Sequence, residues 1–145
     1  LSSSYVPGKS YRGTITSNAR TAPFTTEAVV KSEYDYQAPA KLSSIAGTWN
    51  GGILGGGTGQ IDISAAGAIQ ANLQGCSVTG QAQPRASGKN VFDVGLTFGP
   101  APCRLPGQQT QGIALSFELA GGAKQLVVTG ATADAAAGTA LLAAR

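Results

Sequence analysis

Residues 60–74 read QIDISAAGAIQANLQ, and this stretch decides the fold. Its first part alternates apolar with polar side chains, with Ile61 and Ile63 set against Asp62 and Ser64. The alternation resumes after a short turn of small residues. Because successive side chains of a β-strand point to opposite faces, this period of two predicts two strands, each with one buried face, joined as a hairpin.

The same alternation recurs along the rest of the chain, in segments separated by Gly, Pro, Asn or Ser. The segments are CSVTGQA (76–82), VFDVGLTF (91–98), IALSFEL (113–119), KQLVVTG (124–130) and GTALLAA (138–144). In the second and third of these we expect the following side chains to face inward: Phe92, Val94, Leu96, Phe98, Ile113, Leu115, Phe117 and Leu119. Counting from Trp49 gives about eight strands, the size of a small closed barrel.

We therefore predict an all-β fold, an antiparallel barrel of about eight strands or a barrel-like sandwich. At 145 residues the chain is long enough for one domain with its own core. We expect a flexible lead-in over residues 1–10 and a single β domain over residues 11–145, with the barrel in residues 45–145. The extension formed by residues 11–44 is expected to hold a β-hairpin, in which Tyr11–Thr16 pairs with Phe24–Tyr36.

The glycine-rich stretch GGILGGGTG (51–59) raises the question of a phosphate-binding loop. Such a loop lies between a strand and a helix, so that the helix N-terminus faces the anion. The residues that follow alternate as a strand, and no GxGxxG begins at Gly55 or Gly57. Asn50-Gly51 is instead a typical hairpin-turn dipeptide, with Gly55–Gly59 as a loop or a bulged edge. The stretch is thus interpreted as a corner of the β-structure.

Charge and composition exclude several classes of partner. The ten Lys and Arg residues exceed the seven Asp and Glu by three, and no two of the cations are adjacent. Nucleic-acid surfaces have clustered cations interleaved with aromatic residues, so we expect no nucleic-acid partner. No apolar run approaches the roughly 20 residues that a membrane-spanning helix needs, so we expect no membrane-spanning segment.

The residue types needed for catalysis are largely missing. The chain has no histidine, which removes the usual general base near neutral pH and the commonest metal ligand. No SxxK or GxSxG motif is present. A glycosidase-like carboxylate pair, for example Asp62 with Asp93, would need a separation of about 5–10 Å that nothing in the sequence supports. We therefore expect no enzyme, no metal site and no cofactor.

Two cysteines, Cys76 and Cys103, are the only thiols. Without histidine they cannot complete a zinc site, and their spacing is not that of a CxxC redox motif. They either form one disulfide or are buried separately, and an oxidising compartment favours the disulfide. Methionine is absent, so we expect Leu1 to follow an upstream segment, where any signal peptide or lipid-bearing cysteine would lie.

Two local resemblances bear on the family. Ala46-Gly47-Thr48-Trp49-Asn50 resembles the first strand of lipocalin- and avidin-type barrels, which implies an indole across the base of the barrel. Trp49 is therefore expected to be a core anchor, with a ligand contact as the alternative. Residues 75–103, with the strand-rich tail, are similar to small bacterial envelope proteins, often lipoproteins. That resemblance covers about residues 40–145 and implies an extracytoplasmic β domain with paired cysteines.

The stretch GPAPCRLPGQQTQG (99–112) is the candidate binding loop. Its prolines would stiffen it, a bond at Cys103 would pin it, and Arg104 and Leu105 lie between Pro102 and Pro106. Inhibitory loops of protease inhibitors need such a rigid segment. Pro102-Cys103-Arg104 is similar to the Pro-Cys-basic segment of Kunitz inhibitors, without their cysteine framework. The alternative is a proline-rich connection between two strands.

The sequence leaves three functions open. The first is a non-enzymatic extracytoplasmic binding or structural domain of a bacterial envelope lipoprotein, located in the periplasm, at the outer membrane or outside the cell. The second is an inhibitor of a hydrolase, a protease or lysozyme, acting through residues 99–112 or the arm formed by Leu1–Ser10. The third is a carrier of small apolar ligands of lipocalin type. The expected partner is an envelope protein or a hydrolase.

Overall fold

A computed structural model describes residues 2–6, 9–17, 20–27, 34–119 and 121–145 of the chain. Residues 1–32 and residues 33–145 form two compact units. In the described part of the chain, no helix is both long and apolar enough to cross a membrane.

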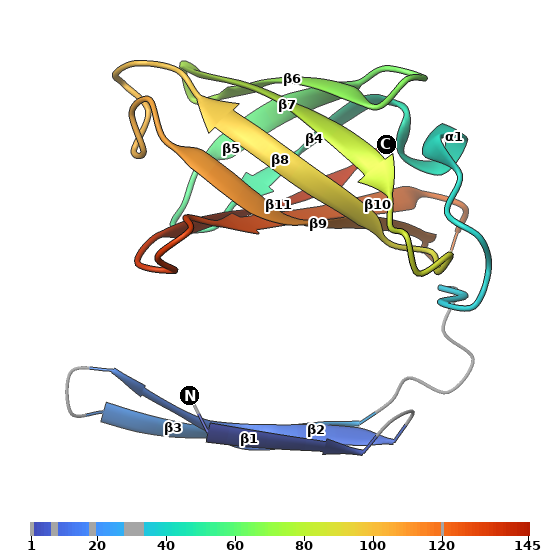
Figure 1. The fold of residues 1–145 in the computed structure, drawn as a ribbon, viewed down its shortest axis with the longest axis vertical. Helices are drawn as coiled ribbons and strands as arrows, with labels where there is room; N and C mark the ends of the chain where they lie inside the picture. The colour runs from blue at the N-terminus through green and yellow to red at the C-terminus, as the bar shows by residue number, and fades with distance from the viewer. Residues whose placement is uncertain (1, 7–8, 18–19, 28–33, 120) are drawn as a thin grey trace. The chain divides into compact units, whose positions relative to one another are not determined.

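The first unit is a three-stranded antiparallel sheet in the order β1-β2-β3 (Figure 1). Its strands are β1 (Ser2–Val6), β2 (Ser10–Ser17) and β3 (Arg20–Glu27). The pairing of β2 with β3 is the hairpin predicted from the sequence. The expectation of a lead-in over residues 1–10 is not met in its described part, because Ser2–Val6 pairs along β2. The serine-rich β1 lacks the alternation by which the other strands were found.

The predicted second strand of that hairpin is shorter than expected. β3 ends at Glu27, and residues 28–33 lie outside the described part of the chain. Tyr34–Tyr36, expected to be extended, leads into a turn that belongs to the second unit. There the backbone N–H of Asn90 donates to the carbonyl of Tyr36 at 3.1 Å, which attaches this segment to the β7–β8 connection.

The second unit is a closed eight-stranded barrel in the order β10-β11-β4-β5-β6-β7-β8-β9, with every neighbouring pair antiparallel (Figure 1). This confirms the predicted all-β fold class, and of the two forms left open, a barrel or a barrel-like sandwich, it is the barrel, which is closed. A short helix, α1 (Leu42–Ile45), precedes the barrel. The strands are β4 (Gly47–Ile53), β5 (Thr58–Ile63), β6 (Ala68–Leu73), β7 (Cys76–Pro84), β8 (Phe92–Phe98), β9 (Gln109–Glu118), β10 (Lys124–Ala131) and β11 (Gly138–Ala144).

Side chains fill most of the barrel interior, as expected for eight strands. Every strand has buried residues on its inward face, although some inward positions are only half-buried, and the largest fully buried side chains include Trp49, Phe92 and Leu126. The alternation predicted for QIDIS is confirmed, because Ile61 and Ile63 are both 3% exposed. The inward set predicted for VFDVGLTF is likewise buried.

For IALSFEL, the face that was predicted to point into the barrel is the wrong one. Phe92 of β8 pairs with Ala114 of β9, and Ala114 is 1% exposed, so the even-numbered residues of β9 face inward. Ile113, Leu115 and Phe117 are only half-buried, and Leu119 is 37% exposed. The reason is volume. Large side chains on β8 and β10 already occupy this part of the interior and leave room for alanine, threonine and serine from β9.

The turn predicted at Asn50-Gly51 is also wrong. Both residues lie within β4, and the hairpin turn falls between Ile53 and Thr58. Gly51 is needed for another reason, since a Cβ there would collide with the backbone of Leu142 on β11. This glycine allows close approach of two strands rather than a reversal of the chain.

α1 and the C-terminus lie at the same end of the barrel (Figure 1), and side chains close this end. Ile45 and Trp49 are both fully buried, and the indole N–H of Trp49 donates to the carbonyl of Ile45 at 2.8 Å. The Arg145 side chain covers the Trp49 ring and donates to the carbonyl of Ala46. Trp49 is thus a buried residue at the base of the barrel.

Candidate functional site at the barrel mouth

Four hairpins meet at the opposite end of the barrel and form its mouth. They connect β4 to β5, β6 to β7, β8 to β9 and β10 to β11, and lie on the left of the barrel in Figure 1. Between them lies a pocket of about 150 Å³. Its apolar lining includes Ile53, Leu54, Leu73, Phe98 and Leu105, and its polar lining includes Gln74, Arg104 and Thr139.

The mouth is shallow. A smaller void of about 20 Å³ is lined by barrel residues such as Ile61, Ile69 and Val128. Leu73 and Thr139 line both spaces, so the void lies below the mouth. The two volumes together are below the roughly 300 Å³ at which pockets for drug-sized ligands begin. The mouth therefore fits a small group rather than a long chain.

A disulfide between Cys76 and Cys103 fixes one side of the mouth. It connects the first residue of β7 to the middle of the β8–β9 loop, and both cysteines are buried. The disulfide favoured by the compartment argument is therefore present. It holds the β8–β9 loop against the barrel wall, so the loop residues of the mouth are ordered before any ligand arrives.

Of the four candidate loop residues, three line the mouth and one does not. Pro102, Arg104 and Leu105 all line the mouth, whereas Pro106 is exposed and lies outside the lining. Consecutive turns fold the loop. The backbone N–H of Cys103 donates to Pro100 at 3.1 Å, and that of Gln108 donates to Leu105 at 3.1 Å. Leu105 packs against the core, so the loop closes over the mouth and is not held out in an extended form.

The glycine-rich stretch forms the facing side of the mouth. Gly55 has a φ of 91°, and a Cβ there would lie 2.8 Å from a guanidinium nitrogen of Arg104. Gly57 has a φ of 93°, and a Cβ there would overlap the Gln74 amide. The glycines therefore let the β4–β5 hairpin reverse while two polar side chains from other hairpins lie against it. The prediction of a β-corner is confirmed, and its position at the mouth is new.

Arg104 gives the mouth a positive charge. Its side chain is exposed at the rim, and within the described ranges it forms no ion pair and no hydrogen bond. The residues that line the pocket include no acidic side chain among those described. An unpaired guanidinium beside an apolar pocket attracts an anion, and its planar fork suits a carboxylate.

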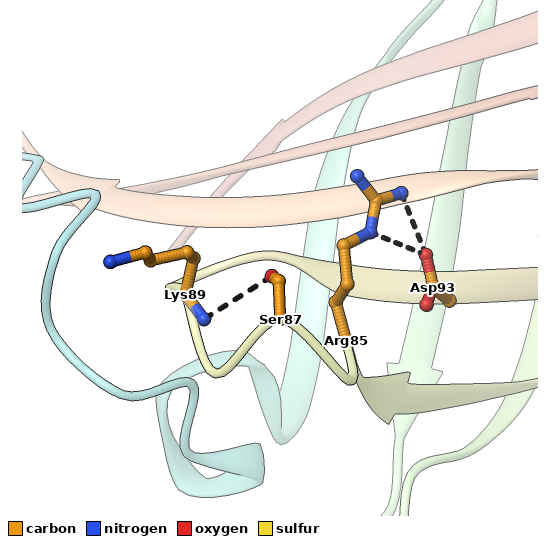
Figure 2. A network of polar contacts seen from close by, with 4 residues as sticks. All are labelled: Arg85, Ser87, Lys89 and Asp93. Atoms are coloured by element: carbon orange, nitrogen blue, oxygen red, sulfur yellow. Dashed lines mark hydrogen bonds and ion pairs between the residues drawn. The ribbon is translucent and has the colours of Figure 1, made fainter.

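The carboxylates considered in the sequence lie on the outer wall of the barrel. Asp62 on β5 accepts a hydrogen bond from the hydroxyl of Thr48. Asp93 on β8 accepts from Arg85 at 2.7 and 2.8 Å (Figure 2). Strands β6 and β7 separate the two carboxylates around the barrel. Over the described residues, no three His, Cys, Asp or Glu side chains gather as a metal site would require.

Sequence reasoning missed two of the polar residues at the mouth, Gln74 and Thr139. Gln74 has a φ of 55° in the β6–β7 turn, and Thr139 is the second residue of β11. Neither belongs to a motif. The available signal was topological, because alternate hairpins of an up-and-down barrel open at the same end. Applied to the predicted strands, that rule would have placed both residues at the same end of the barrel as Arg104.

Comparison of the chain with protein-family models, with curated proteins and with solved structures finds no significant match.

Proposed function

We propose that this chain is a non-enzymatic binding domain of an extracytoplasmic protein of the bacterial envelope, and that it holds a small group of its partner in the barrel mouth. The observation that carries the proposal is the mouth itself. Four hairpins converge there on one pocket, and a disulfide fixes the loop that supplies Pro102, Arg104 and Leu105. A site ordered before binding loses less entropy when its ligand binds.

The disulfide supports the extracytoplasmic setting, because such bonds form and persist in oxidising compartments. Thiol titration of protein taken from its source tests this part of the proposal. We expect Cys76 and Cys103 to be unreactive until the protein is unfolded and reduced. Two thiols that react in the unfolded, unreduced protein would contradict an extracytoplasmic setting.

The geometry favours a binding domain over a carrier of lipocalin type and over an inhibitor that acts through residues 99–112. A carrier of lipocalin type needs a deep cavity, whereas Phe92, Leu126 and their neighbours occupy the interior below the mouth. A protease-inhibitor loop needs an extended segment with a basic side chain held outward. Here the loop is folded into turns, and Arg104 lies against the β4–β5 hairpin.

Titration of the isotope-labelled protein with small molecules tests the mouth as a binding site. The panel consists of benzene-sized compounds, aromatic and branched, with and without charge. We expect saturable amide shifts near Leu54, Gln74 and Leu105. In the Thr139→Phe variant, a phenyl ring would fill the pocket, and the same shifts should be lost. A thermal melt confirms that this variant is folded. Absence of saturable shifts at the mouth across the whole panel, at about 10 mM, would overturn the proposal.

A further inference from the structure

We infer that the group held in the mouth is a carboxylate carried on a compact apolar body. The inference rests on the proposed function and specifies its ligand class. Three features of the mouth converge on it, namely the size of the pocket, the apolar character of its wall and the unpaired cation at its rim. Each excludes a different class of ligand.

Size excludes long ligands. A cavity of 150 Å³ lined by Leu, Ile and Phe is large enough to bind benzene. The mouth has a volume of about 150 Å³, so it accepts one aromatic ring or one branched side chain. A lipid chain or a drug-sized molecule would extend beyond the four hairpins.

The wall excludes a purely polar ligand. Ile53, Leu73 and Phe98 line the pocket from β4, β6 and β8, and Leu105 joins them from the disulfide-pinned loop. Apolar surface buried there contributes about 25 cal/mol per Å². A small hydrophilic anion would leave this wall in contact with water and lose that contribution.

The rim excludes a cationic ligand and favours an anionic one. The Arg104 guanidinium lies close to Gly55, which places it at the edge of the pocket. The Gln74 amide lies on the same side, against Gly57, and supplies a second polar contact. A bidentate pair with Arg is the strongest common arrangement for a carboxylate. The ligand therefore places its apolar body in the pocket and its carboxylate at Arg104.

Two sources share this chemistry. One is a free aromatic or branched acid. The other is the C-terminus of a peptide whose last residue is apolar, where the α-carboxylate and the side chain lie close together. Probes of both kinds separate them: benzoate against benzamide for the free acid, and acetyl-Gly-Leu acid against its C-terminal amide for the peptide.

The experiment measures the affinity of each probe by amide chemical shifts, at low ionic strength, for the native chain and two variants. We expect benzoate to bind about tenfold more tightly than benzamide. Arg104→Gln should remove this preference, because it removes the cation and keeps an exposed polar side chain. Lys41→Gln is the matched control: it removes an exposed cation just before α1, at the closed end, and should leave the preference unchanged.

The outcomes separate this inference from the proposed function. Equal binding of benzoate and benzamide at the mouth would overturn the carboxylate inference and leave the binding site intact. Loss of preference in Lys41→Gln as well as in Arg104→Gln would also overturn it, since net charge would then be responsible. Binding of no probe at the mouth would overturn both proposals. Tighter binding of acetyl-Gly-Leu acid than of benzoate, together with a preference for the peptide acid over its amide that Arg104→Gln removes, supports the inference and assigns the source to a peptide C-terminus.

Discussion

The guanidinium carbon of Arg145 lies 4.1 Å from the centre of the Trp49 ring, at the end of the barrel opposite the mouth. The last residue of the chain thus covers the indole that fills the base. The backbones of Arg145 and Lys124 also exchange two hydrogen bonds, of 3.0 and 3.1 Å, which extend the pairing of β10 with β11 by one residue. The base of the barrel is therefore closed by side-chain and backbone contacts together.

Replacing Arg145 should loosen this base. Arg145→Ala removes the cation–π contact and the hydrogen bond to Ala46, and we expect a loss of about 1 kcal/mol in the free energy of unfolding. Urea unfolding followed by Trp49 fluorescence measures it. Arg104→Ala is the control, because it removes an exposed arginine that has no ion pair within the described residues. Equal effects of the two substitutions would show that the contact with Trp49 contributes nothing.

The disulfide should stabilise the barrel through the loop that it closes. Cys76 and Cys103 are 27 positions apart, and a loop of that length gives about 3–4 kcal/mol in the chain-entropy model. We expect the double variant Cys76→Ala/Cys103→Ala to lose about that amount, and amides in residues 99–108 to exchange faster with solvent. Reduction of the native chain without mutation should reproduce both effects. An unchanged exchange rate in the loop would contradict its role as a fixed wall of the mouth.

Thr110 offers a site for stabilisation. Its side chain is 1% exposed in the interior, and its hydroxyl oxygen has no hydrogen-bond partner among the described residues. Thr110→Val keeps the shape and removes the buried hydroxyl, so we expect a gain of about 1 kcal/mol in the free energy of unfolding. Thr97→Val, at an exposed position on β8, should change stability by less than about 0.5 kcal/mol. A loss of stability in Thr110→Val would show that the hydroxyl has a bonding partner such as a buried water.

The β10–β11 turn should show a pH dependence set by Asp134. The carboxylate accepts a hydrogen bond from the hydroxyl of Thr132 at 2.6 Å and from the backbone N–H of Ala136 at 3.1 Å. These bonds, the Thr132 bond above all, lower the pKa of Asp134 below that of an ordinary aspartate. Because the pKa is lower in the folded chain, the stabilisation is present above the unfolded pKa of about 4 and is lost as pH falls through the folded value.

Carboxyl resonances followed by NMR measure this pKa directly. Thr132→Val removes the largest cause and should raise the pKa of Asp134 toward its ordinary value. Thr129→Val, on the outer face of β10, is the control and should leave the pKa of Asp134 unchanged. A pKa that is the same in Thr132→Val and in the native chain would disprove the role of this hydroxyl.

Leucine-to-alanine substitutions at two positions test which face of β9 points into the barrel. Leu126 faces inward and is fully buried, so Leu126→Ala should cost about 2–5 kcal/mol. Leu115 lies on the outer face and is half-buried, so Leu115→Ala should cost about 1 kcal/mol. Chemical denaturation of both variants gives the difference. Equal losses in the free energy of unfolding would favour the orientation predicted from the sequence, in which Leu115 is a core residue.

The sequence predicted the barrel because, in most of its strands, only one of the two faces is apolar enough to be the buried face. In β5 and β8 the large apolar side chains occupy every second position, so the inward face follows from the residues alone. In β9 both faces are apolar enough to be buried, with Ala114 on one and Leu115 on the other. Only the pairing with Phe92 decides between them, and that pairing is a property of the assembled sheet.

The mouth could be predicted only in part, for a related reason. The prolines and Cys103 identified the β8–β9 loop, since rigid residues and a cysteine are visible in a linear sequence. Gln74 and the glycines of the β4–β5 hairpin gain their role from neighbours distant in the chain. The turn predicted at Asn50-Gly51 was wrong because the prediction used only a local preference. The dipeptide strongly favours a turn, but in the structure Gly51 allows β11 to lie close to β4.

The two ends of the barrel differ: α1 and Arg145 lie at one end, and the four hairpins lie at the other (Figure 1). A sensor surface or a fused reporter joined through Arg145 by a short spacer leaves the hairpins open to solution. The same attachment through Leu54 would obstruct them. Immobilised ligand assays on this protein should therefore be oriented by the C-terminus.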